Sequence, residues 1–172
     1  SNAIDLTNVT TISSATMSEM LEIVNNTNAT FTTAPNYSVT ISDTSVTAAN
    51  VKTINGDNGT GAINISAANS ISGTVSDVLE IVNNTGSVFT TNVNYDVILD
   101  AGVAIASQIT AIESANGTGT INGSGITAIN GTTAEITQAL IDIDTDPTNF
   151  NSTITGVAIA SQITAIESAN GT

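Results

Sequence analysis

The sequence predicts a mixed α/β solenoid of about six strand–helix units of about 29 residues, with a stacked parallel sheet and helices on its outer side. One observation is that the segment GVAIASQITAIESANGT occurs twice without a difference, at residues 102–118 and 156–172. A second is that the chain aligns with itself at a shift of 58 residues, which places LEIVNNT at 21–27 on LEIVNNT at 79–85. A third is that the apolar residues change within each period from helical spacing to strand-like alternation.

Helix starts mark the units. Thr16, Thr74 and Thr132 are each followed three residues later by an acidic residue, and this pattern is typical of a capping box at a helix N-terminus. Weaker starts fall between them, near Ser45, Gly102 and Gly156. Successive starts are about 29 residues apart, so each 58-residue period contains two units.

The predicted helices carry one apolar stripe each. Ile105, Ile109 and Ile112 lie at i, i+4 and i+7, which places them on one helical face. The same spacing recurs at Ile159, Ile163 and Ile166, and a related one at Val75, Val78, Leu79 and Val82. These segments are therefore predicted to be short amphipathic helices.

Short alternating runs lie between the helices. Apolar residues recur at every second position at Val39 and Ile41, at Ile63 and Ile65, and at Tyr95, Val97 and Leu99. This alternation predicts short strands. The abundance of Thr, Ile and Val, together with Asn-Gly turns, leaves an all-β solenoid or sandwich as the alternative fold.

Domain organisation follows from the repeat. Residues 1–3, Ser-Asn-Ala, resemble what remains after removal of an expression tag and are excluded from the fold. Residues 4–172 are predicted to form a single repeat domain, with double repeats that start near positions 16, 74 and 132. Because the last unit copies an internal one, we expect a segment of a longer array. We also expect an apolar face near Ile159, Ile163 and Ile166 and end-to-end self-association.

Composition limits the partners. The chain has fifteen acidic residues, one Lys and no His, and its net charge is −14. Nucleic acids and anionic membrane surfaces should repel such a chain, because binding to phosphate requires Lys and Arg. No apolar run is long enough for membrane insertion. The absence of Cys excludes disulfides and thiolate nucleophiles.

The search for chemistry finds carboxylates alone. Without His, Cys or Arg, the common acid–base and nucleophilic arrangements cannot be built, so we expect no enzyme. Asp142, Asp144 and Asp146 alternate within one segment and could present oxygen atoms to Ca²⁺ as a weak site. The segment lacks the Gly and terminal Glu of a calcium-binding helix–loop–helix, and a solvated acidic loop is the favoured interpretation. No other cofactor is expected.

Two further sets of residues recur. Asp43 and Asp100 each follow a predicted strand and precede a predicted helix, so we expect them to cap helices. The aromatic residues that repeat at 58 positions are expected to fill the core, and they are Phe31, Tyr37, Phe89 and Tyr95.

The alternation of INISAANSISGT (residues 63–74) with SDVLEIVNNT (residues 76–85) resembles the acidic, Thr/Asn-rich repeat arrays of very large surface or secreted proteins of aquatic bacteria. The strand–helix unit is also distantly similar to leucine-rich repeats. The resemblance implies a non-enzymatic structural or adhesive segment of an extracellular or cell-surface protein. The alternative is a ligand-binding module that uses the exposed sheet face or loops to bind a glycan, a divalent cation or a partner protein.

Overall fold

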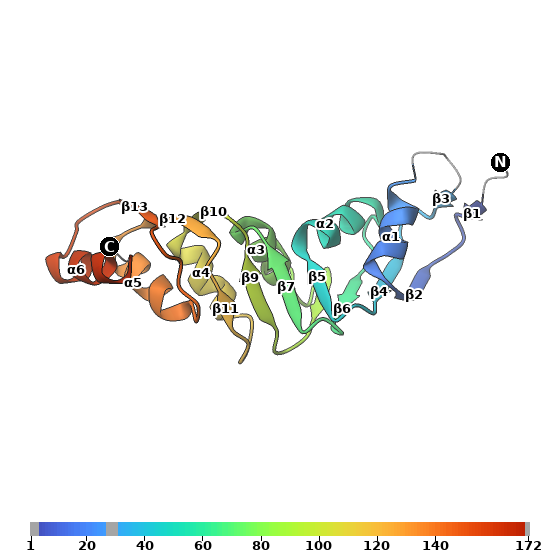
Figure 1. The fold of residues 1–172 in the computed structure, drawn as a ribbon. Coiled ribbons are helices and arrows are strands. Elements are labelled where there is room, and N and C mark those ends of the chain that lie inside the picture. The colour runs from blue at the N-terminus through green and yellow to red at the C-terminus, as the bar shows by residue number, and fades with distance from the viewer. Residues whose placement is uncertain (1–3, 27–30, 171–172) are drawn as a thin grey trace.

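The computed structural model describes residues 4–26 and 31–170. The presumed tag remnant and residues 171–172 of the second copy lie outside this range. The molecule is elongated, and its elements follow one another along the long axis from the N-terminal end to helix α6 (Figure 1). The chain is mixed α/β with parallel sheets, so the all-β alternative is wrong.

Short strands alternate with six helices in the described residues. The strands are β1 (Ile4–Leu6), β2 (Thr11–Ala15), β3 (Phe31–Thr33), β4 (Ser38–Ile41), β5 (Ser45–Thr47), β6 (Ile63–Ile65), β7 (Ser70–Gly73), β8 (Phe89–Thr91), β9 (Asp96–Leu99), β10 (Gly102–Ile105), β11 (Ile121–Asn122), β12 (Ile126–Gly131) and β13 (Asn151–Ile154). The helices are α1 (Met17–Val24), α2 (Ala48–Asp57), α3 (Val75–Asn83), α4 (Ala106–Glu113), α5 (Thr133–Asp142) and α6 (Ala160–Ala169).

The three predicted capping residues begin helices. The hydroxyls of Thr16, Thr74 and Thr132 each accept a hydrogen bond from the backbone N–H three residues later. At Thr16 and Thr132 the acidic side chain also accepts from the backbone N–H of the capping residue, which completes the capping box. This part of the prediction is confirmed.

The three weaker starts were placed too early. Strands β5 and β10 begin at Ser45 and Gly102, and helices α2, α4 and α6 begin three or four residues after the predicted positions. Two of these segments pair with a neighbouring strand before they enter a helix, because their alternating apolar residues suit a half-buried strand. Helix α2 is capped by Thr47, which accepts from the N–H of Asn50 at 3.4 Å.

The strands form four parallel sheets, where one was predicted. Their orders are β1-β3, β2-β4-β6-β8, β5-β7-β9-β11 and β10-β12-β13. A turn within a unit separates two strands and sends them to different sheets. Between β6 and β7, for example, the turn is closed by a bond from the N–H of Ala68 to the carbonyl oxygen of Ile65 at 2.9 Å.

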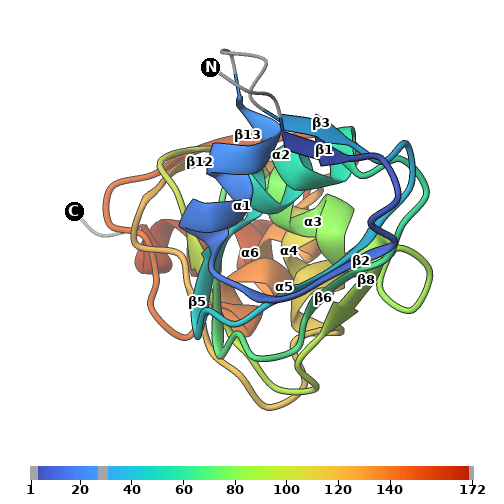
Figure 2. The same ribbon diagram turned by 90° about the vertical axis from the view of Figure 1, so that its right-hand side faces the viewer.

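Each strand pairs with a strand that lies about one unit away along the chain. In one sheet Val46 lies beside Ile71, Ile71 beside Val97, and Val97 beside Ile121. Parallel pairing of this kind requires the chain to return in the same direction after each helix. The helices form a single row in which each packs against the next (Figures 1 and 2).

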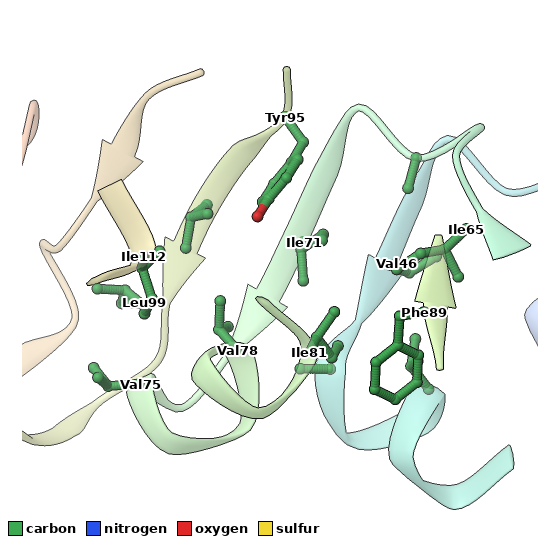
Figure 3. Close-up of a cluster of buried hydrophobic side chains, with 14 of the residues drawn as sticks. Val46, Ile65, Ile71, Val75, Val78, Ile81, Phe89, Tyr95, Leu99 and Ile112 are labelled. Atoms are coloured by element: carbon green, nitrogen blue, oxygen red, sulfur yellow. The ribbon is translucent and has the colours of Figure 1, made fainter. Parts of the chain in front are cut away.

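One hydrophobic core runs between the helices and the strands (Figure 3). Helix α3 contributes Val75, Val78 and Ile81, which are buried. Helix α4 buries Ile109 and Ile112 as predicted. Ile105, the third member of the predicted stripe, is exposed because it caps the helix and ends strand β10.

The recurring aromatic residues belong to this core. Tyr37, Phe89 and Tyr95 are buried, and Phe31 is partly buried. Their expected role as core residues is confirmed for the three buried side chains. Within the described residues, none of the helices has the length and apolar character needed to cross a membrane.

Candidate functional site

The acidic segment follows helix α5. Asp142 is the last residue of the helix and is half-buried, whereas Asp144 and Asp146 lie in the loop beyond it and are exposed. Burial raises the pKa of Asp146 above its ordinary value. We examined whether these three carboxylates form one site.

Two of the three carboxylates accept hydrogen bonds that join neighbouring elements. Asp142 accepts from the hydroxyl of Thr110 on helix α4 at 2.7 Å. Asp144 accepts from the backbone N–H of Ile121 on strand β11 at 2.7 Å. These bonds connect consecutive units, and they occupy carboxylate oxygens that the calcium hypothesis assigned to an ion.

Glu113, which the sequence did not single out, lies near this segment. Burial, together with the charges of Asp142 and Asp144, raises the pKa of Glu113. Its buried Oε2 atom has no hydrogen-bond partner in the described part of the chain. No sequence spacing indicated this proximity, since Glu113 is separated from Asp142 by a whole unit.

No group of three or more His, Cys, Asp or Glu side chains in residues 4–26 and 31–170 is arranged to hold a metal ion. The structure therefore does not gather Asp142, Asp144 and Asp146 into such a group. Calcium binding by this segment stays a prediction, and the bonds of Asp142 and Asp144 give these residues a structural role.

Asp43 caps a helix, although not the helix that follows it. Its carboxylate accepts from the backbone N–H of Met17, the first residue of α1, at 2.7 Å. The negative charge therefore lies at the N-terminus of the helix in the preceding unit, where the helix dipole favours it. For Asp100 the structure gives a backbone bond, from its N–H to the carbonyl oxygen of Gly73 at 2.9 Å.

The most regular polar feature is a joint between units, which we call the Asn-Gly joint. In its first instance, residues 58–61 (Asn-Gly-Thr-Gly) pack on Asn36 and Tyr37. The buried Asn58 side chain donates to the carbonyl oxygens of Tyr37 at 3.2 Å and Gly61 at 2.7 Å. The Asn36 side chain accepts from the backbone N–H and the hydroxyl of Thr60, both at 2.9 Å.

The glycines of this joint allow close approach. A Cβ atom added to Gly61 would overlap the carbonyl oxygen of Tyr37, and one added to Gly119 would overlap that of Tyr95. Only a residue without a side chain permits the two backbones to lie this close. The Asn-Gly-Thr-Gly sequence is therefore explained by contact between units.

The joint recurs one period later. Residues 116–119 pack on Asn94 and Tyr95, where the side-chain oxygen of Asn94 accepts from the N–H of Thr118 at 3.0 Å. The backbone N–H of Tyr95 donates to Asn116 at 3.2 Å. In the second copy of the repeated segment, the N–H of Asn149 donates to the carbonyl oxygen of Asn170 at 3.0 Å. The same residues thus make the same contact in successive units.

Side chains also connect consecutive helices. Lys52 on α2 forms ion pairs with Asp77 at 2.6 Å and Glu80 at 2.8 Å, both on α3. Between α5 and α6, the hydroxyl of Thr133 donates to the side-chain oxygen of Gln162 at 2.7 Å. The hydrogen bonds and ion pairs in this region act mainly between units.

Comparison of the chain with known protein families, characterised proteins and solved structures gave no significant match.

Proposed function

We propose that the chain is a solenoid segment of strand–helix units with its helices on the outer side. The regular parallel pairing between units and the single row of helices support this proposal. Neighbouring units are the main partners of each unit, because no unit of about 29 residues can bury enough apolar surface to be stable alone.

The segment acts as a non-enzymatic structural or adhesive spacer of an extracellular or cell-surface protein. The observation that carries this proposal is the Asn-Gly joint, because the residues that recur at 58 positions are those that hold units together. A catalytic site is a single arrangement of residues, whereas a spacer gains length and stiffness from each repeated joint.

A distance measurement tests the spacer. The chain contains no Cys, so spin labels can be attached to introduced cysteines alone. Ser18, Ser76 and Ala134 are exposed and each is the second residue of its helix, in α1, α3 and α5. We measure the Ser18→Cys/Ser76→Cys and Ser18→Cys/Ala134→Cys pairs by pulsed electron resonance.

A stiff solenoid gives narrow distributions in which the second distance is about twice the first. Neither distance should change when glycans or divalent cations are added. Broad distributions, or a second distance no longer than the first, would rule out a stiff spacer. A change of distance on adding one class of ligand would favour the ligand-binding alternative.

A further inference from the structure

The two identical segments have different structures at their N-terminal ends. In the first copy, residues 102–105 form strand β10, which pairs in parallel with β12. In the second copy, the same four residues at 156–159 are described but form no strand. The sequence is the same, so the difference lies in what surrounds it.

The helices that follow differ in the same way. Ile109 of α4 is 0% exposed, whereas Ile163, its counterpart in α6, is 42% exposed. Val157 and Ile159 are also exposed, at 91% and 53%. We call Val157, Ile159 and Ile163 the α6 face. In the first copy, the unit of β12 and α5 packs on the corresponding side.

The N-terminal unit of the chain is a unit of the same kind. A shift of two periods, or 116 residues, places β2 on residues 127–131 of β12 and α1 on residues 133–140 of α5. The helices of both units begin with a complete capping box, at Thr16 and at Thr132. The chain therefore carries at one end the kind of unit that is absent from the α6 face at the other end (Figure 1).

The strand edges are complementary as well. Strand β7 has β5 on one side and β12 has β10 on the corresponding side, but β2, the equivalent strand, ends its sheet among the described residues. Strand β2 also has an irregular register between Ile12 and Ala15. Both unpaired equivalents, β2 and residues 156–159, thus depart from the regular strands that their paired counterparts form.

We propose that two copies of this chain associate head to tail, with β2 and α1 of one copy covering residues 156–159 and helix α6 of the other. Because Ala104 pairs with Ile129 in the first copy, the repeat places Ala158 beside Ser13 of the second molecule. The contact is heterologous, so it leaves a free face at each end and adds further copies in a line. The inference stands on pairing and exposure and is independent of the proposed spacer function.

Charge affects the strength of this contact. Each copy has a net charge of −14, and the repulsion between copies is screened by salt. Association should therefore strengthen when salt is raised from about 0.05 M to about 1 M.

Sedimentation velocity on the full chain tests the proposal, over concentrations from about 10 µM to about 1 mM. We expect species larger than a dimer at high concentration and high salt. Ile163→Gln should weaken association about tenfold or more, because it removes apolar contact from the α6 face. Ile98→Gln is the matched control, since Ile98 is 45% exposed on strand β9, away from both ends. Circular dichroism checks that each variant is folded, and Ile159→Gln provides a second variant of the face.

A mixing experiment separates head-to-tail contact from packing of two α6 faces. The Ile163→Gln chain keeps its N-terminal unit, so it should bind the α6 face of an unmodified copy and shorten the assemblies. A distribution that stops at dimers and excludes the variant would overturn the proposal in favour of symmetric packing. A chain that stays monomeric throughout, or one that Ile98→Gln weakens as much as Ile163→Gln, would also overturn it.

Discussion

The hydroxyl of Tyr37 donates a hydrogen bond to the carboxylate of Asp57 at 2.7 Å. One period later Tyr95 is buried at the equivalent position, but Ala115 takes the place of Asp57. The Tyr95 hydroxyl has no hydrogen-bond partner among the described residues. Burial raises the pKa of both phenols, that of Tyr95 to about 12, and the bond with Asp57 adds to the effect at Tyr37.

This pair of tyrosines leads to a matched prediction. Tyr37→Phe should lower the free energy of unfolding by about 1 to 2 kcal/mol, because it removes a hydrogen bond to a charged group. Tyr95→Phe should be neutral or slightly stabilising, since it removes a hydroxyl that is buried without a partner. Urea denaturation measures both changes. Equal losses in the two variants would contradict the difference between the two sites.

The Asn-Gly joint predicts a large effect of a small substitution. Gly61→Ala should lower the free energy of unfolding by about 2 kcal/mol or more, because the added methyl group overlaps the backbone of Tyr37. Gly56→Ala is the control. Gly56 lies in helix α2 with no neighbouring atoms near an added Cβ, so this change should stabilise by about 0.5 to 1 kcal/mol. Loss of stability in Gly56→Ala alone would show that the joint does not matter.

The repeated segment allows identical residues to be compared in two environments. Ile109→Ala should cost about 2 to 5 kcal/mol, as expected for a fully buried side chain. Ile163→Ala should cost less than about 1 kcal/mol at concentrations where the chain is monomeric, because the side chain is partly exposed. Denaturant midpoints of the two variants decide this, and similar losses would mean that α6 is covered in the isolated chain.

Glu113 predicts a pH dependence. Burial and the nearby charges of Asp142 and Asp144 raise its pKa, so the folded chain holds this proton more tightly than the unfolded chain. Its ionisation therefore destabilises the fold above the raised pKa, and this penalty disappears below the ordinary value of 4.5. Glu113→Gln should stabilise the chain by about 0.5 kcal/mol at neutral pH and have no such effect in acid.

Glu167→Gln is the control for this prediction, because Glu167 is the equivalent exposed residue of the second copy. Thermal unfolding at several pH values measures the difference between the two variants. A stabilisation by Glu113→Gln that is independent of pH would contradict the electrostatic explanation.

Calcium should change stability little. An ion that binds only the folded chain raises the unfolding free energy as RT ln(1 + [L]/Kd), so melting curves with Ca²⁺ and with EDTA give a direct test. We expect a shift of about one degree or less, because Asp142 and Asp144 already accept structural hydrogen bonds. A rise of many degrees that is lost in Asp146→Asn would instead establish a calcium site in the acidic segment.

Much of the architecture could be predicted from local signals. The starts of three helices were predictable because a capping box involves residues only three positions apart. The strands at Ile63 and Val97 were also predictable, since alternation is visible within a few residues. The mixed α/β class followed from these two kinds of pattern.

Contacts between units could not be predicted in this way. That Asp43 caps helix α1, that Glu113 lies near Asp142, and that Asn58 is buried against Tyr37 all depend on how one unit stacks on the next. These partners lie between 21 and 29 residues apart, and no local pattern specifies the register between units.

The sequence by itself determined the period, the helix starts and the absence of the residue types that common catalytic sites require, because each of these is a property of nearby residues or of composition. Only the tertiary structure decided that Ile109 is buried and Ile163 is partly exposed, although both lie in the same seventeen-residue sequence. The physical reason is that burial depends on the atoms of the neighbouring unit, and identical segments become different when one has such a neighbour and the other does not.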